Sequence, residues 1–270
     1  MKVDFHVHTN YSDGVFSVEE VIKKAEERNV KILAITDHDN IDAFDEAKKI
    51  KTEIKLIAGV ELTTYHLEKP VHILGYFKNN DSSSAELRIF LQNMQEQREQ
   101  RIKKMIKNLK TIFNIKIEYN DIIKNALGVV GRPHLAKAIS DKYHITVNQA
   151  FDLYISNDSP VFVPTVGLDT KDGIDLLLRN NAIPVLAHPS LIFAGAPEDF
   201  ISMGIQGIEV FHPHNSHKQR KAYRKLAIQN NFFITGGTDF HGDFHNGQHV
   251  GISNLSKDQI NIILKQINLD

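Results

Sequence analysis

The sequence contains no cysteine and no tryptophan among its 270 residues. The lack of thiols excludes a disulfide framework, a thiolate zinc site, an iron–sulfur cluster and a cysteine nucleophile. Any transition metal must therefore bind to nitrogen and oxygen ligands. Apolar residues make up 41% and charged residues 24% of the chain, which is the composition of an ordinary globular protein.

Long apolar runs are also missing. No run approaches the roughly 18 residues that a membrane span needs, and Met1 to His6 form no apolar signal segment. We therefore expect a cytoplasmic protein with no membrane contact. The 32 Lys and Arg residues nearly balance the 33 Asp and Glu residues, so the formal charge of -1 gives no global attraction to nucleic acid.

Histidine is abundant, with 14 residues in the chain. Imidazole is the commonest metal ligand and the usual acid or base near neutral pH, so these residues must be divided into candidate ligands and bystanders. Five of them fit no ligand motif and are expected at surface or loop positions: His66, His144, His217, His245 and His249.

The apolar pattern predicts short strands that alternate with helices. Expected strands cover 3–7, 31–36, 56–62, 71–77, 183–187, 207–211 and 232–235. Expected helices cover 17–29, 42–50 and 172–180, and the first opens with a capping box at Ser17 and Glu20. Such alternation predicts parallel βαβ units, and 270 residues allow either two compact domains or one large α/β barrel.

The alternation of strands and helices stops between residues 81 and 164. A long polar helix over 88–109 and a second helical stretch after Gly131 are expected there. We predict a discontinuous barrel domain, 1–80 and 165–270, with a helical insertion domain at 81–164. The long helix carries a basic run that predicts a solvated face, with guidance of an RNA tail as the alternative: Arg98, Arg101, Lys103, Lys104, Lys107 and Lys110.

Candidate ligands begin on the first predicted strand. His6 and His8 are two residues apart, so the period of a strand places both imidazoles on one face, where they can converge on one ion. A His-x-His pair alone is a weak signal. Asp13 follows in a polar turn, where a carboxylate is also common without a metal.

The same kind of side chain recurs on or after the later strands, in five places. These residues are His38, Glu61, His72, His188 and the pair Asp239 and His241. Singly, each could be a capping, turn or hydrogen-bonded core residue. Together they indicate a metal site at the mouth of a barrel, because side chains at successive strand ends meet there.

The order of these motifs resembles the PHP (polymerase and histidinol phosphatase) family of metal-dependent phosphoesterases. The resemblance covers about 1–78 and 183–242 and rests on His-x-His, Thr-Asp-His, Gly-x-Glu, His-x-Leu-Gly, Ala-His-Pro and Asp-x-His. A Gly-Arg-Pro-His segment, Gly131 to His134, is similar to that of the YciV/TrpH-like subgroup. The resemblance implies an α/β fold, a distorted (β/α)7 TIM-like barrel with a helical insertion and up to three metals at its mouth.

Carried over residue by residue, the resemblance also implies the ligands. The first metal would lie on His6, His8, Glu61 and Asp239, the second on Glu61, His72 and His188, and the third on Asp13, His38 and His241. Glu61 and Asp239 would bridge the metals, and Glu61, Asp239 and His241 would hold a metal-activated water. Such ligands suit Mn²⁺, which we favour, and also Fe²⁺ or Zn²⁺, with two or three ions per chain.

The activity implied is hydrolysis of nucleotide phosphate monoesters, either nucleoside 3′,5′-bisphosphates or 5′-monophosphates, with 5′ to 3′ degradation of short RNA as an extension. Histidinol-phosphate phosphatase is an alternative enzyme, and a non-catalytic metal-binding PHP module is the alternative of another class. An amidohydrolase also carries His-x-His on its first strand, but would leave Asp13 and the Thr36-Asp37-His38 motif without a role. Neither a long nucleic acid duplex nor an obligate protein partner is expected.

Residues outside the ligand set should select the substrate. Arg132 could bind a phosphate through two hydrogen bonds or could be a surface arginine at a helix start, and His134 is similar. His212 and His214 are candidates for phosphate contact. Glu209 either orients a metal ligand or is a paired buried carboxylate.

Overall fold

The computed structural model describes residues 1–124, 128–164, 167–242, 249–252 and 254–269. Its strands form one seven-stranded sheet in the order β1-β2-β3-β4-β5-β6-β7. The strands are β1 (Lys2–Asp4), β2 (Val30–Ile35), β3 (Lys55–His66), β4 (Lys69–Phe77), β5 (Ala182–Leu186), β6 (Gly207–Phe211) and β7 (Phe233–Gly236).

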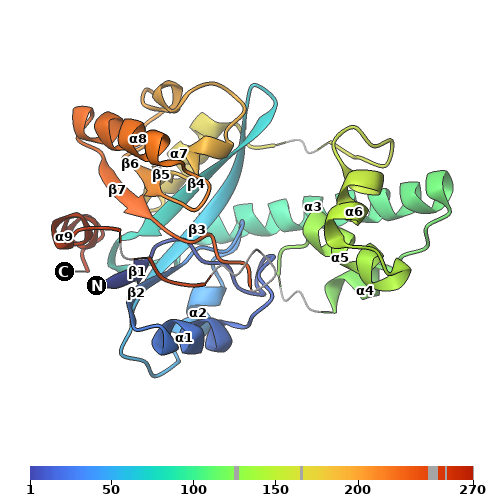
Figure 1. Ribbon diagram of the computed structural model, residues 1–270, viewed down its shortest axis with the longest axis horizontal. Coiled ribbons are helices and arrows are strands. Elements are labelled where there is room, and N and C mark those ends of the chain that lie inside the picture. The colour runs from blue at the N-terminus through green and yellow to red at the C-terminus, as the bar shows by residue number, and fades with distance from the viewer. Residues whose placement is uncertain (125–127, 165–166, 243–248, 253, 270) are drawn as a thin grey trace.

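Helices cover the outside of this sheet and form a separate group to one side (Figure 1). The α-helices are α1 (Val18–Glu27), α2 (Ala43–Ala47), α3 (Ala85–Phe113), α4 (Tyr119–Ile123), α5 (Arg132–Tyr143), α6 (Val147–Ala150), α7 (Thr170–Arg179), α8 (His217–Gln229) and α9 (Lys257–Gln266). Short helical turns are η1 (Lys78–Asn80), η2 (Phe151–Ile155), η3 (Pro189–Leu191) and η4 (Pro197–Phe200).

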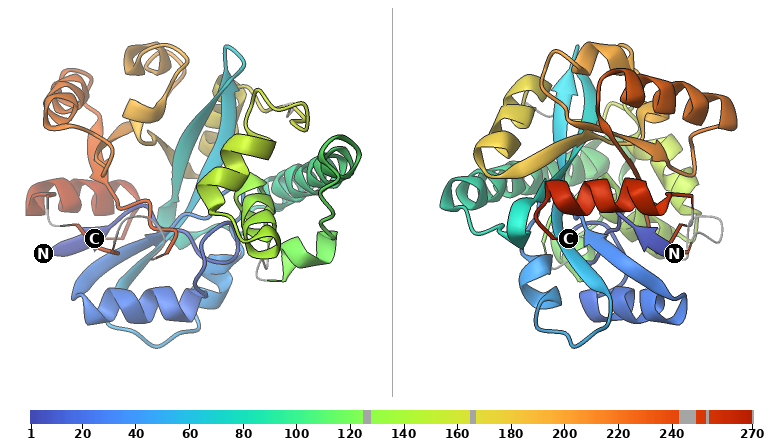
Figure 2. Two further views of the ribbon diagram at one scale, coloured as in Figure 1. Left: turned by 45° about the vertical axis from the view of Figure 1, so that its right-hand side comes forward. Right: turned by 90° about the vertical axis from the view of Figure 1, so that its left-hand side faces the viewer.

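The sheet closes on itself through the chain that follows β7. Asp239 donates its backbone N–H to the carbonyl of His6 at 2.9 Å, and His8 donates to the carbonyl of Phe240 at 3.0 Å. These bonds place the segment after β1 beside the segment after β7. Helices α1, α8 and α9 pack on the outside of the closed sheet (Figure 2). The predicted class, a distorted α/β barrel, is confirmed.

Parallel βαβ units were predicted from the alternation of strands and helices, and β4 does not belong to one. Strand β4 pairs antiparallel with both β3 and β5. The physical reason for the first pair is the two-residue turn Leu67-Glu68, whose φ values of 47° and 60° close a tight hairpin. A parallel pair would need a crossover of about a dozen residues or more.

The first helix forms as its sequence predicts. The Ser17 side chain accepts from the N–H of Glu20, and the Glu20 carboxylate accepts from the N–H of Ser17 at 2.8 Å. The apolar residues recur at helical spacing and are buried against the barrel: Val18, Val21, Ile22 and Ala25. Helix α2 is shorter than predicted and has no side-chain hydrogen bond at its N-cap, Asp42.

Helix α3 contributes residues to two separate hydrophobic clusters. Leu87 and Leu91 at its start belong to the barrel core, whereas Ile102, Met105 and Leu109 belong to a second core that lies within residues 102–161. Figure 1 shows α3 leading from the barrel to α4, α5 and α6. The boundaries at 80/81 and 164/165 stay a prediction, and residue 165 lies outside the described residues. No helix in the described part of the chain is long and apolar enough to cross a membrane.

The second core predicts a stability effect. Met105 is fully buried, so Met105→Ala removes apolar contacts, leaves a cavity and should lower the free energy of unfolding by about 2–5 kcal/mol. Ile112 on the same helix is 47% exposed, and Ile112→Ala should cost much less. Urea denaturation of both variants measures the difference. Equal small losses would show that residues 102–161 do not form a packed core.

Candidate metal centre

The Glu61 carboxylate, near the middle of β3, is the centre of the site. Its two oxygens face five imidazoles. Oε2 lies 3.0 Å from His6 Nε2, 3.0 Å from His8 Nε2 and 3.2 Å from His38 Nδ1. Oε1 lies 2.9 Å from both His72 Nδ1 and His188 Nε2. Four segments of the chain thus bring their imidazoles to one buried carboxylate.

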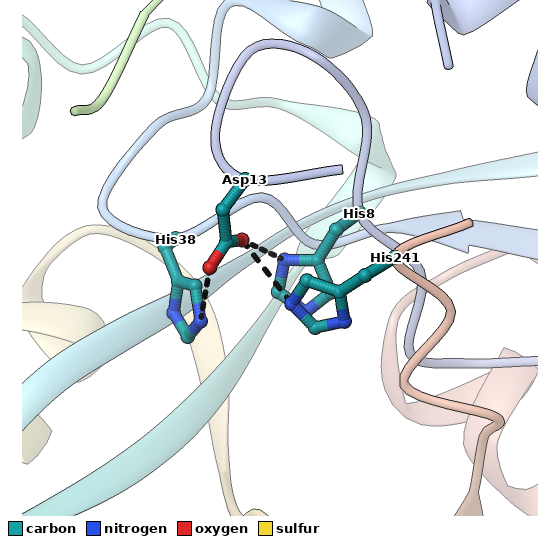
Figure 3. Close-up of side chains that lie close together, drawn as sticks. All are labelled: His8, Asp13, His38 and His241. Atoms are coloured by element: carbon teal, nitrogen blue, oxygen red, sulfur yellow. Dashed lines mark ion pairs between the residues drawn. The ribbon is translucent and has the colours of Figure 1, made fainter. Parts of the chain in front are cut away.

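Three groups of side chains are close enough to hold metal ions, because their ligand atoms lie within 4.8 Å of one another. The groups are His6, His8, Glu61 and Asp239; His38, Glu61 and His72; and His8, Asp13, His38 and His241. Figure 3 shows the third group, with the Asp13 carboxylate between three imidazoles. His241 Nε2 lies 3.1 Å from Asp13 Oδ1.

All nine predicted ligands are brought together, with some differences in grouping. The first group is the one that the family resemblance implies. His38 lies near Glu61 and His72 as well as near Asp13, and His8 lies near the third group. His188 contacts Glu61 and has its Nε2 3.3 Å from His72 Nδ1. The division of these ligands among individual metals stays a prediction.

The donor atoms fit a divalent cation. Several buried ligand atoms have no hydrogen-bond partner among the described residues: His6 Nε2, His8 Nε2, Asp13 Oδ1, His38 Nδ1, Glu61 Oε2 and His188 Nδ1. Buried polar atoms are normally paired, so an unpaired group of imidazole and carboxylate atoms needs an explanation. Nitrogen and oxygen donors at this spacing are those that Mn²⁺, Fe²⁺ or Zn²⁺ would satisfy.

The carboxylates of the site are held in the ionised form. Burial alone would raise the pKa of Glu61, but His38, His6 and His72 outweigh it and hold the pKa well below its usual range. The pKa of Asp239 is likewise lowered against burial, chiefly by His6 and His241. Negative charge is therefore present at the site to attract cations.

Buried carboxylates outside the ligand set hold the ligands in place. Glu209 on β6 accepts from the backbone N–H of His188 at 2.8 Å and lies 3.0 Å from Nδ1 of His6. This geometry is the one expected of a residue that orients a metal ligand, which is one of the two roles predicted for Glu209. A carboxylate at Nδ1 favours the tautomer that leaves Nε2 of His6 free for a metal.

Asp4 and Asp37 have similar structural roles, which sequence reasoning did not find. Asp37 accepts from the N–H and hydroxyl of Thr9, both at 2.8 Å, and from the Ser12 hydroxyl at 2.6 Å, so it holds the loop before Asp13. Asp4 accepts from Thr238 N at 2.9 Å and from Thr238 Oγ1 at 2.7 Å, next to Asp239. One signal was available for Asp4, since it shares the strand face of His6 and His8.

Gly237 allows the segment after β7 to approach His6 closely. A Cβ at this position would lie 2.3 Å from the Cβ of His6 and 2.6 Å from its backbone nitrogen. Any side chain there would displace His6, so the glycine lets the segment after β7 pass directly beside the first ligand.

A cavity of about 890 Å³ opens beside the cluster and reaches the helical region. Asp13, His38 and His72 line one part of it. Elsewhere its lining includes Arg98 and Arg101 of α3 and Arg132 at the start of α5, with Tyr65, Phe151 and Phe162. The expectation that Arg98 and Arg101 lie on a solvated face was wrong. Both are partly buried, and Arg98 contacts Asp39 and Thr63 of the barrel.

The guanidinium groups of Arg101 and Arg132 both lie over the ring of Phe162. Their guanidinium groups lie 5.3 Å and 5.2 Å from the centre of the ring. Arg101 donates to the carbonyl of Val163 at 2.6 Å, and Arg132 donates to Asn157 at 2.7 Å. Neither makes an ion pair with a carboxylate among the described residues. Burial, followed by repulsion from Arg132 and Arg98, lowers the pKa of Arg101 to about 10.

The other predicted substrate residues are absent from the lining of this cavity. His134 accepts from the N–H of Gly131 at 3.1 Å at the start of α5. His212 is buried and has its Nε2 3.3 Å from Asp239 Oδ2, while its Nδ1 accepts from the N–H of His214. His214 is exposed. The roles of these residues in substrate binding stay predictions.

Four of the five histidines predicted to be bystanders are described by the structure, and they lie outside the ligand groups. His144, His217 and His249 are exposed, and His66 is half-buried near the β3–β4 turn. His245 lies outside the described residues.

Comparison with known proteins identifies the family. Residues 4–159 match the family model of the PHP domain, which is more than half of the chain. The chain therefore belongs to the PHP domain family, as predicted.

Several relatives align with nearly the whole chain. The 3′,5′-nucleoside bisphosphate phosphatase of Chromobacterium violaceum is 26% identical over 92% of this chain and 90% of its own length. The 5′-3′ exoribonuclease of Haemophilus influenzae is 29% identical over 89% of this chain and 90% of its own length. The phosphoribosyl 1,2-cyclic phosphate 1,2-diphosphodiesterase of Eggerthella lenta is 24% identical over 92% of this chain and 97% of its own length.

A solved structure supports the same class. A Bifidobacterium adolescentis protein assigned as a metal-dependent phosphoesterase superposes with a TM-score of 0.88 at 27% identity, over 98% of this chain and 96% of its own. The relatives are thus named for phosphoesterase activities, which is the class of activity predicted for this chain. A metal-dependent class also agrees with the imidazole and carboxylate donors described above.

The charge of the site predicts how metal affinity depends on pH. Burial lowers the pKa of His8, but the nearby carboxylates of Asp239 and Glu61 outweigh it and raise the pKa to about 10 in the metal-free protein. A cation must therefore displace a proton, and its affinity should rise with pH up to about 10. Isothermal titration calorimetry with Mn²⁺ in two buffers of different ionisation enthalpy measures the proton release.

His217 is exposed on α8, and His217→Ala should release as many protons as the unchanged protein. Binding heats that do not depend on the buffer would contradict the prediction.

Proposed function

We propose that this protein is a metal-dependent phosphoesterase that hydrolyses phosphate monoesters of nucleotides, with nucleoside 3′,5′-bisphosphates, 5′-monophosphates and the 5′ end of short RNA as candidate substrates. One observation carries the proposal. Three of the nine candidate ligands, Asp13, His38 and His72, line the same cavity as Arg98, Arg101 and Arg132, so the metal centre and a group of arginines face one space.

The metal site takes two or three divalent ions in this proposal, with Mn²⁺ favoured over Fe²⁺ and Zn²⁺. The ligands would be His6, His8, Asp13, His38, Glu61, His72, His188, Asp239 and His241. When bound, such ions lower the pKa of water and offset the charge of phosphoryl oxygens. The side chains of Glu61, Asp239 and His241 would hold the attacking water, and those of Glu209 and His212 would keep His6 and Asp239 in place.

Arg101 and Arg132 supply the recognition of a second phosphate. Guanidinium groups bind phosphate through paired, charge-assisted hydrogen bonds, and neither of these groups is neutralised by a carboxylate among the described residues. Phe151 and Phe162 lie beside them and offer apolar faces to a nucleoside. This arrangement favours a bisphosphate or a short oligonucleotide over histidinol phosphate, which carries a single phosphate.

A substrate panel tests the proposal. Protein reconstituted with Mn²⁺ is given adenosine 3′,5′-bisphosphate, AMP, a short 5′-phosphorylated RNA and histidinol phosphate, and phosphate release is measured. We expect turnover of the nucleotides, and His8→Ala should lose both bound metal and turnover. Release from histidinol phosphate alone would support the alternative phosphatase. Metal binding without any turnover would support a non-catalytic module.

The arginine pair predicts a substrate-dependent change. Arg132→Met should raise KM for adenosine 3′,5′-bisphosphate by about ten- to a hundredfold, since a charge-assisted hydrogen bond contributes about 1.5–3 kcal/mol. The KM for AMP should change much less. Lys107→Met, an exposed position on α3 outside the cavity, is the control and should leave both constants unchanged. An equal rise for both substrates would exclude a second phosphate site at Arg132.

The proposal also includes a cytoplasmic location and activity without an obligate protein partner. Fractionation of cells that express the tagged protein, and gel filtration of the purified active protein, test these two points.

A further inference from the structure

Helix α3 touches the barrel mouth at its midpoint, between its two hydrophobic ends. Arg98 makes an ion pair with the carboxylate of Asp39, and Gln95 donates to the Asp39 carbonyl at 3.3 Å. The Arg98 guanidinium also donates to the hydroxyl of Thr63 at 2.8 Å. The helix that leads to the second core is therefore tied to the segment directly after His38.

Asp39 stands at the junction of two ligand-bearing segments. Its backbone N–H donates to the carbonyl of Glu61 at 3.0 Å, and Glu61 in turn donates to the carbonyl of Asp37 at 3.1 Å. The Asp39 carboxylate accepts from the N–H of Thr63 at 2.7 Å. Asp39 also adopts the left-handed conformation, with φ of 47°, which an L-residue holds only where its surroundings fix it.

The Asp39 carboxylate depends on Arg98 for its counter-charge. The Asp39 side chain is fully buried, and Arg98 is its ion-pair partner among the described residues. A buried carboxylate that loses its partner is left with an uncompensated charge, which is strongly unfavourable. The segment 37–39 can relieve this by moving the carboxylate toward water, and His38 would move with it.

We propose that Arg98 is a positioning residue for the metal centre: through its ion pair with Asp39 it fixes His38 and Glu61 in the geometry that binds metal. Residues outside the ligand set that orient metal ligands commonly contribute about 10- to 100-fold to metal affinity. The inference rests on the proposed function only in taking these residues as metal ligands. It gives the helical region a role in forming the metal site itself.

Arg98 also lines the cavity, so its loss could affect a phosphate contact as well. Metal affinity, measured without substrate, separates the two roles. Asp39 is absent from the lining of the cavity, and Asp39→Asn removes the ion pair while leaving the guanidinium in place. A contact with substrate alone would leave metal affinity unchanged in both variants.

The test measures Mn²⁺ dissociation constants by calorimetry, together with metal retained after dialysis. Arg98→Met should weaken binding by about 10- to 100-fold, and Arg98→Lys, which keeps the charge, should recover part of that loss. The matched control is Arg88→Met. Arg88 lies on the same helix and pairs with Asp42 and Asp45, but its partners are 55% and 39% exposed, so its loss should leave metal affinity unchanged.

A double-mutant cycle completes the test. If Arg98 acts through Asp39, the double variant Arg98→Met with Asp39→Asn should bind Mn²⁺ no more weakly than the worse single variant. Additive losses, or unchanged affinity in Arg98→Met, would overturn the proposal. Should Arg98→Met fail to fold, as judged by circular dichroism, Arg98→Lys and Asp39→Asn decide the same question. Absence of turnover in the unchanged protein would contradict the proposed function but not this metal-affinity result.

Discussion

The structure depends on a single buried carboxylate, that of Glu61. Its two oxygens lie within 3.2 Å of five imidazoles from four segments of the chain. A buried negative charge is tolerated only where positive charge or hydrogen-bond donors surround it. Each of these five imidazoles must therefore reach the same point, and that requirement constrains the strand register, the loop paths and the closure of the barrel between β7 and β1.

Further buried carboxylates hold the residues and loops that surround Glu61. Glu209 holds His6 and His188, Asp37 holds the loop before Asp13, and Asp4 holds the segment before Asp239. Asp39 differs from them because its partner, Arg98, comes from the helix that carries the second core. One side of the cavity thus carries candidate metal ligands and the other side carries arginines. Helix α3 supplies two of these arginines and, through Arg98, also contacts the segment that bears His38.

Much of the fold and the site could be predicted from the sequence. Strand and helix positions follow from the apolar periodicity, and the capping box at Ser17 sets the start of α1. The nine candidate ligands could be named because metal chemistry restricts the residue types to imidazole and carboxylate. The antiparallel pairing of β4 was missed, because the two left-handed residues of its turn, Leu67 and Glu68, carry no turn signature such as Gly or Asn.

By itself, the sequence determined the class of chemistry: a chain without thiols but with many histidines can hold transition metals only through nitrogen and oxygen. The tertiary structure alone decided which charges face one another. Arg98 and Arg101 belong to a run of similar basic residues, and only the path of α3 over the barrel mouth separates these two from the solvated ones. The physical reason is that burial and counter-charge depend on neighbours in space, which local sequence patterns do not encode.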